Sequence, residues 1–286
     1  MTPVPRALLR RKADTHKGDY GHLLVVGGSI GFTGAPILCA LAALRSGAGL
    51  VSLGVPEPVY LIVASQLIEV MVHPLPESPS GTLSVNALAT LYPLVLKSDV
   101  IALGPGLSQS PFAQKAVHRI LTTIDLPIVL DADGINAVSG KDRTVLTKAR
   151  GPVVITPHPG EMGRLLGIST EEVQRRRVEI AVKVAKELKV VVVLKGRRTV
   201  VASPTGRSHI NSTGNPGMAT AGMGDLLTGM IGALIGQGLD PFVAAKAGAY
   251  LHGLAGDLAV RRVGQISLMA GDVLASIPDA FKKVSP

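Results

Sequence analysis

Short runs of β-branched and aliphatic residues recur along the chain, and each is followed by a turn and a segment of helical periodicity. Several runs, such as VVVVLK at 190–195, are apolar at successive positions, as expected of parallel strands that helices cover on both faces. This alternation is typical of one layered α/β domain. The expected strands are residues 22–28, 50–55, 99–104, 127–131, 153–156, 190–195 and 199–202.

The segments between these strands carry helical patterns. At the helix expected over 240–263, Asp240 suits the N-cap, Pro241 the first helical position and Gly264 the stop. The fold class predicted is a three-layer α/β/α sandwich with a mostly parallel central sheet, formed as one domain by residues 1–286. The other expected helices are residues 35–46, 84–96, 111–122, 170–188 and 225–236.

Composition and charge limit the kinds of partner and compartment that we expect for this protein. The net charge is +9, but the basic residues are scattered and only 3% of residues are aromatic, so we expect no nucleic-acid partner. No uninterrupted apolar run reaches the roughly 18 residues of a membrane span, so no membrane association is expected. The single cysteine, Cys39, excludes an intrachain disulfide and fits a reducing compartment, so a cytoplasmic location is expected.

The strongest chemical signal lies at residues 211–227, NSTGNPGMATAGMGDLL. Glycines expose backbone N–H groups, and a helix start adds unsatisfied N–H groups and the positive end of its dipole, which together bind anions. Asp225 would repel phosphate but can deprotonate a hydroxyl that attacks a bound phosphoryl group. The alternative is that Asp225 merely caps the helix. The glycines are Gly214, Gly217, Gly222 and Gly224.

Two common nucleotide motifs are excluded. In a Walker A loop, Lys and Ser/Thr would stand where this chain has Met223 and Gly224. No G-x-G-x-x-G follows any expected strand, so a Rossmann-type nicotinamide site is unsupported.

Polar residues follow several expected strands. Asp131 and Asp133 could orient Mg²⁺ or a hydroxyl, or Asp133 could cap a turn with Gly134 in a left-handed conformation. His158 is held between two prolines, which would stiffen its loop. The basic segment 195–199 could offset phosphate charge, or it could be a plain hairpin turn.

The TAGMGD sequence at 220–225 is similar to the G-x-G-D motif of ribokinase-like small-molecule kinases. The longer context resembles one branch of that superfamily, the ADP/ATP-dependent NAD(P)H-hydrate dehydratases. Four further segments carry the resemblance across nearly the whole chain. They are 17–35 (KGDYGHLLVVGGSIGFTGA), 131–136 (DADGIN), 156–161 (TPHPGE) and 195–199 (KGRRT).

The resemblance implies dehydration of the S-epimer of hydrated NADH or NADPH, with ADP or ATP as phosphoryl donor and Mg²⁺ present. It makes Asp225 the catalytic base and a substrate contact, beside the substrate positions Ala35, Gly106 and His158. It implies no direct metal ligand, although Glu161 would help to organise Mg²⁺ through water. It assigns the adenine nucleotide to Lys195, Gly196, Arg197, Arg198 and Thr199, with Gly222 and Gly224 at the phosphate.

The resemblance also implies a homo-oligomer, for which a tetramer is one form. The family often carries a fused epimerase domain, and we expect none in these 286 residues, so a separate epimerase would act beside this protein. Two other functions stay open: a kinase of a small vitamin-like alcohol, and a module that senses adenine nucleotides without chemistry. The sequence does not decide between ADP and ATP or between the two hydrates.

Overall fold

The computed structural model describes residues 3–285, which form a nine-stranded sheet in the order β3-β2-β1-β4-β5-β6-β7-β8-β9. Neighbours from β3 to β7 are parallel, whereas β8 and β9 are antiparallel to their neighbours. The predicted mostly parallel sheet is therefore confirmed. The strands are β1 (His22–Val26), β2 (Leu50–Pro56), β3 (Met71–Leu75), β4 (Val100–Leu103), β5 (Ile128–Leu130), β6 (Val153–Ile155), β7 (Val191–Leu194), β8 (Val200–Ala202) and β9 (Ser208–Ile210).

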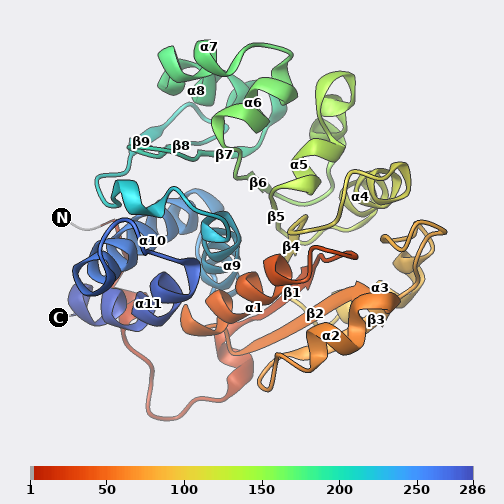
Figure 1. Ribbon diagram of the computed structural model, residues 1–286, viewed down its shortest axis with the longest axis horizontal. Coiled ribbons are helices and arrows are strands. Elements are labelled where there is room, and N and C mark those ends of the chain that lie inside the picture. Colours follow the sequence, from red (N-terminus) through yellow and green to blue (C-terminus); the bar gives the residue numbers. More distant parts are fainter. Residues whose placement is uncertain (1–2, 286) are drawn as a thin grey trace.

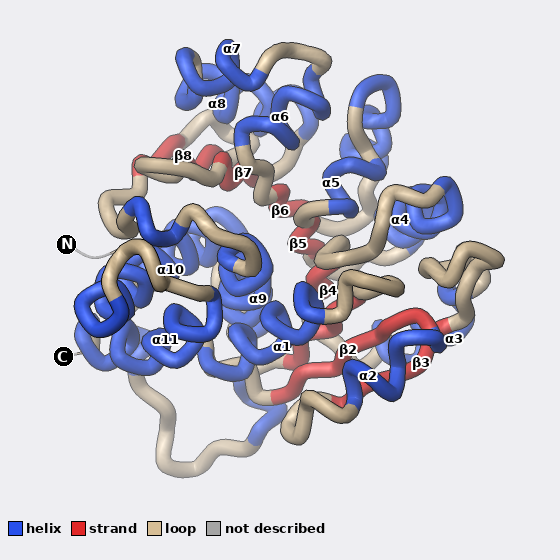
Figure 2. Tube along the Cα trace, in the orientation of Figure 1, coloured by secondary structure: helices blue, strands red, loops and turns tan. Residues whose placement is uncertain are grey.

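Helices bury both faces of the sheet, as the apolar strands require. Along β1, Leu23 and Val25 belong to one apolar core, whereas Leu24 and Val26 belong to the other. Figure 1 shows α1, α9, α10 and α11 on one side of the sheet and α4 to α8 on the other, and Figure 2 shows the strands running between these layers. The helices are α1 (Gly34–Arg45), α2 (Tyr60–Ala64), α3 (Ala87–Val95), α4 (Pro111–Thr123), α5 (Asp133–Ala137), α6 (Pro159–Leu166), α7 (Thr170–Arg175), α8 (Arg177–Leu188), α9 (Met223–Gly236), α10 (Pro241–Val263) and α11 (Ala270–Val284).

The helix boundaries follow local chemistry. The Asp240 side chain accepts hydrogen bonds from the backbone N–H groups of Phe242 and Val243, and Gly264 ends α10 with φ +75°, so both predicted signals are confirmed. The single helix expected over 170–188 is wrong, because Arg176 (φ −122°) separates α7 from α8. None of the helices described within residues 3–285 is both long and apolar enough to cross a bilayer.

A glycine brings α9, the helix that starts with the glycine-rich motif, against α1. A Cβ added at Gly229 would lie 2.0 Å from the carbonyl oxygen of Cys39. The two backbones therefore touch, and the pair fixes where α9 begins relative to the sheet.

We expect Gly229→Ala to lower the free energy of unfolding by about 3 kcal/mol, because the methyl group must push two buried helices apart. Denaturant unfolding of the two proteins measures this difference. Gly271→Ala is the matched control: it places a methyl group in α11 with nothing within 4 Å, so stability should hold or rise. Equal stability of the Gly229→Ala variant and the original protein would contradict the close contact.

Candidate active site

The predicted site residues gather at one edge of the sheet, where β1, β4, β5, β6 and β7 end side by side. Asp131 directly follows β5, and Lys195 directly follows β7. His158 lies three residues beyond β6, at the start of α6, and Gly106 lies three residues beyond β4. Carboxyl ends of parallel strands are the usual ligand edge of α/β proteins. Folding thus brings together segments that are up to 190 residues apart in the sequence, as the span from Ala35 to Asp225 shows.

The glycine-rich motif starts α9 at this edge. Gly222 is the N-cap in a left-handed conformation (φ +87°), and an added Cβ would lie 2.7 Å from Leu38 Cδ1. Asp225 lies inside the first turn, so it is not the N-cap residue itself. A Cβ added at Gly224 would lie 3.1 Å from Lys195 Nζ. The first-turn N–H groups and the helix dipole make this start suited to an anion.

A buried ion pair lies beneath that first turn. Lys195 Nζ donates to Asp131 Oδ1 at 2.7 Å, and Thr228 of α9 donates to Asp131 Oδ2 at 2.8 Å. Lys195 Nζ also lies 3.7 Å from Glu161 Oε2. Burial opposes the charge on Asp131, but Lys195 and its hydrogen bonds prevail and hold the pKa of Asp131 below its usual value. The same carboxylates outweigh burial at Lys195 and raise its pKa.

The pKa of the Asp225 carboxyl group indicates what chemistry the site can perform. Burial, followed by the negative charge of Asp131, raises the pKa of Asp225 to about 7, while Lys195 partly offsets them. A carboxyl group poised near neutral pH is well suited to act as a general base. The structure therefore places a carboxyl group of raised pKa in a helix start that is suited to an anion.

His158 and Glu161 form a capping box at the start of α6. The ring Nδ1 of His158 accepts from the backbone N–H of Gly160 at 3.0 Å, and Glu161 Oε2 accepts from the backbone N–H of His158 at 2.7 Å. Burial lowers the pKa of His158 despite the nearby Glu161. The imidazole is consequently neutral and its orientation is fixed, and its contact with substrate stays a prediction.

The carboxylates of Asp133 and Asp131 have different hydrogen-bond partners and do not act together. Asp133 Oδ2 accepts from the backbone N–H of Ser108 at 2.8 Å, and Asp133 is the first residue of α5. The left-handed residue of this turn is Ala132 (φ 49°), so the expectation for Gly134 is wrong. Gly134 is required for another reason: an added Cβ would lie 2.8 Å from the carbonyl oxygen of Leu103.

The His and acidic side chains at this edge of the sheet are not arranged to bind a metal ion directly. Across residues 3–285 there is no cluster of three or more His, Cys, Asp or Glu side chains suited to a metal ion. One oxygen of Asp131 is taken by Lys195, and one oxygen of Glu161 accepts from the backbone of His158. A divalent cation at this edge would therefore need most of its oxygen ligands from phosphates and water.

A pocket of about 770 Å³ adjoins the start of α9. Its wall includes the whole predicted segment Lys195, Gly196, Arg197, Arg198 and Thr199, together with Gly224, whereas Gly222 is not part of the wall. The segment is the hairpin turn between β7 and β8, and its contact with a nucleotide stays a prediction. The volume matches that of a nucleotide-sized ligand site.

The sequence did not single out several residues of this wall. Asn211, Thr213 and Asn215 belong to the glycine-rich stretch but attracted no separate notice. His252 lies on α10, where a helical pattern predicts core and gives no sign of a ligand pocket. Burial, with the positive charge of Lys195, lowers the pKa of His252 to about 4, so its imidazole is neutral.

Two predicted substrate positions are neighbours. A Cβ added at Gly106 would lie 3.5 Å from the Ala35 Cβ and 2.6 Å from the carbonyl oxygen of Phe32. Gly106 has φ +69°, so both its conformation and its space favour glycine. Their contact with a nicotinamide nucleotide stays a prediction.

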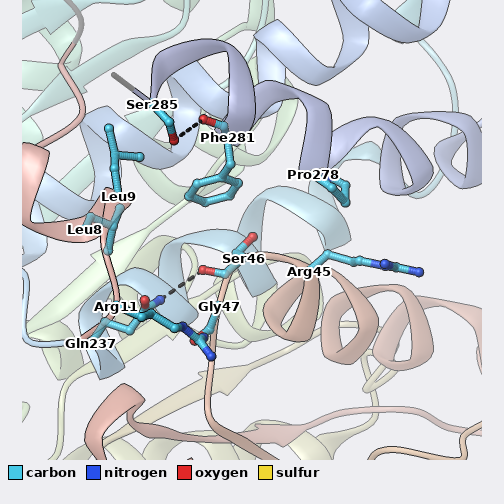
Figure 3. A pocket seen from close by; sticks show the side chains of 10 residues that line it. All are labelled: Leu8, Leu9, Arg11, Arg45, Ser46, Gly47, Gln237, Pro278, Phe281 and Ser285. Atoms are coloured by element: carbon cyan, nitrogen blue, oxygen red, sulfur yellow. Dashed lines mark hydrogen bonds between the residues drawn. The ribbon is translucent and has the colours of Figure 1, made fainter. Parts of the chain in front are cut away.

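A smaller pocket of about 290 Å³ lies elsewhere, between the N-terminal segment and the end of α11. Figure 3 shows Leu8, Leu9 and Phe281 lining it, with Gln237 donating to the carbonyl oxygen of Ser46. None of the predicted site residues belongs to its wall. It therefore plays no part in the proposed chemistry.

The topology and the glycine-rich start of α9 define a ribokinase-like α/β protein. Ribokinase from Thermotoga maritima superposes with a TM-score of 0.56 over 92% of this chain and 99% of its own, and its 16% identity makes this a likeness of fold.

The chain belongs to the NAD(P)H-hydrate dehydratase family, whose family model matches residues 23–279. The bifunctional NAD(P)H-hydrate repair enzyme Nnr of Moorella thermoacetica is 54% identical over 97% of this chain. This chain spans 52% of that relative, about half its length. The ADP/ATP-dependent NAD(P)H-hydrate dehydratase of Bacillus subtilis, co-crystallised with ATP and Mg²⁺, is 35% identical, with a TM-score of 0.81 over 97% of this chain and 95% of that one.

Proposed function

We propose that this protein dehydrates the S-epimer of hydrated NADH or NADPH, using ADP or ATP as phosphoryl donor and releasing AMP or ADP with phosphate. The observation that carries the proposal is the position of Asp225. It lies in the first turn of α9, between Gly224 and Leu227, which line the nucleotide pocket, and its pKa is raised to about 7. Family membership favours this reaction over the kinase alternative.

In the proposed mechanism, Asp225 takes the proton from the added hydroxyl of the nicotinamide ring. The hydroxyl oxygen attacks the terminal phosphorus of the nucleotide, and the bond from that phosphorus to the leaving AMP or ADP breaks. The ring nitrogen lone pair then expels inorganic phosphate. Loss of a proton from the neighbouring ring carbon restores the dihydropyridine. The amides at the start of α9 would stabilise the charge on the phosphoryl group, at roughly 3–4 kcal/mol for a well-placed donor.

Further parts of the proposal concern partners. Mg²⁺ would arrive with the nucleotide phosphates, and Glu161 is the acidic side chain placed to organise it through water. The relative from Moorella thermoacetica is bifunctional, which supports functional pairing with an NAD(P)H-hydrate epimerase. We also propose a homo-oligomer, such as a tetramer, acting in the cytoplasm without nucleic-acid or membrane partners.

A coupled assay tests the function. Purified protein is incubated with hydrated NADH or NADPH, Mg²⁺, and ADP or ATP in turn, while free phosphate and the absorbance of reduced nicotinamide are measured. Equal amounts of phosphate and restored NADH are the expected result. A stable phosphorylated alcohol from another substrate would establish a kinase instead, and nucleotide binding without turnover would establish a sensing module.

The pH dependence of kcat/KM follows from Asp225. Because the base must be ionised and its pKa is about 7, kcat/KM is expected to fall tenfold per pH unit below about pH 7 and to level off above it. Initial rates from pH 5.5 to 9 measure this fall in kcat/KM, which is the acid limb of the pH profile. A profile that stays flat down to pH 5.5 would contradict a base with a raised pKa.

A further inference from the structure

Asp131 is fixed by backbone contacts before any ligand binds. Its side chain is 1% exposed, and its backbone N–H donates to the carbonyl oxygen of Leu103 on the adjacent strand. Gly104 has φ +124°, and a Cβ added there would lie 1.9 Å from the carbonyl oxygen of Asp131. The carboxylate therefore projects from a position that has little freedom to shift.

The Asp131 carboxylate faces the same side of α9 as Asp225. Thr228 Oγ1 donates to Asp131 Oδ2 at 2.8 Å, and Thr228 follows Asp225 by three residues, so the two share one helix face. The other oxygen, Oδ1, binds Lys195 Nζ at 2.7 Å. The ammonium group in turn lies against the first turn at Gly224. The ion pair thus occupies the space under the helix start.

Asp225 faces few other charges. Glu161 of α6 contributes negative charge more weakly than Asp131 does, and Lys195 contributes the positive charge. From α1, the thiol of Cys39 is neutral, because burial, with the negative charges of Asp225 and Asp131, raises its pKa. From α10, His252 lies near Lys195 and is also neutral. Asp131 is therefore the dominant charge acting on Asp225.

We propose that Asp131 is a positioning residue of the reaction: it holds Lys195 at the start of α9, and its carboxylate acts on Asp225, on the same helix face, as a neighbouring negative charge. This role rests on the proposed function of Asp225. The cation beside Asp131 in this structure is the ammonium group of Lys195. The two carboxylates share one cation, so one stays ionised and the other gains proton affinity.

The kinetic test compares Asp131→Asn with Thr228→Val. Asp131→Asn removes the charge, so the acid limb of kcat/KM should move roughly one pH unit or more below its position in the original protein. Thr228→Val removes only the hydrogen bond to Asp131, so its limb should move by no more than a few tenths. A slower Asp131→Asn variant whose limb stays near pH 7 would overturn the proposal.

A second measurement needs no substrate. The original protein should lose stability relative to Asp225→Asn as pH rises from about 4 to about 7, because its folded state retains a proton that its unfolded state releases. The quantity measured is the unfolding free energy of the original protein minus that of the variant. In an Asp131→Asn background, that fall should end at lower pH. If it still ends near pH 7, the proposal fails whatever the enzyme's substrate is. If Asp131→Asn alone does not fold, the double variant Asp131→Asn/Lys195→Met, which leaves no unpaired buried charge, replaces it in both tests. The shift toward lower pH should persist, because Asp131 acts on Asp225 more strongly than Lys195 does, and a transition that stays near pH 7 would overturn the proposal.

Discussion

Replacing Asp225 by asparagine is expected to reduce kcat by roughly 10²- to 10⁴-fold, the usual contribution of a general base. The amide has the shape of the carboxylate but cannot accept the hydroxyl proton. The coupled assay of phosphate and reduced nicotinamide measures the loss. Nucleotide affinity should hold or rise, because the neutral amide does not repel the phosphates.

Asp279→Asn is the matched control for that loss. Asp279 is exposed on α11 and paired only loosely with Lys282 at 3.8 Å, so the same chemical change should leave turnover unaltered. The Asp225→Asn variant should also be at least as stable as the original protein at pH 8, since burial makes the ionised Asp225 costly. Near-normal turnover in this well-folded variant would remove Asp225 from the role of base.

Replacing Lys195 by methionine is expected to lower the free energy of unfolding by about 3–5 kcal/mol at pH 8, because it leaves the Asp131 carboxylate buried without its counter-charge. The loss should shrink as pH falls, since protonation of Asp131 removes the unpaired charge. Thermal or denaturant unfolding without nucleotide measures it across pH 5 to 8.

The control is the same substitution at an exposed ion pair. Lys183 and Glu187 lie 3.8 Å apart on α8, with 66% and 55% of their side chains exposed, so Lys183→Met should cost less than about 1 kcal/mol. Adding Asp131→Asn to Lys195→Met should recover much of the lost stability, because both members of the pair are then uncharged. Equal costs for the two lysine substitutions would contradict a stabilising role for the buried pair.

Most of the fold could be predicted from the sequence, because its strands are apolar on both faces. All seven expected strands exist, and their ends differ by only one or two residues. The edge strands β3 (Met71–Leu75) and β9 (Ser208–Ile210) were missed, since each has exposed positions and a less apolar pattern. The break between α7 and α8 was also missed, because the apolar spacing continues through Arg176, where the backbone leaves the helical conformation.

The site was only partly predictable. Motifs next to strand ends predicted Asp225 and the segment 195–199 as site residues, and the structure places them at the start of α9 and in the wall of the adjoining pocket. The ion pair between Asp131 and Lys195 joins residues 64 positions apart, so no local sequence pattern predicts it. The pocket wall contributed by α10 was hidden for a similar reason: His252 occupies a helix whose periodicity is accounted for by packing alone.

The single cysteine has a practical consequence. Cys39 is fully buried in α1, and burial raises the pKa of its thiol, so little reactive thiolate forms at neutral pH. A fluorophore or spin label aimed at thiols should therefore leave the native chain unmodified. A cysteine introduced at an exposed position such as Ile68 would then be a unique attachment point, with no need to remove Cys39 from the core first.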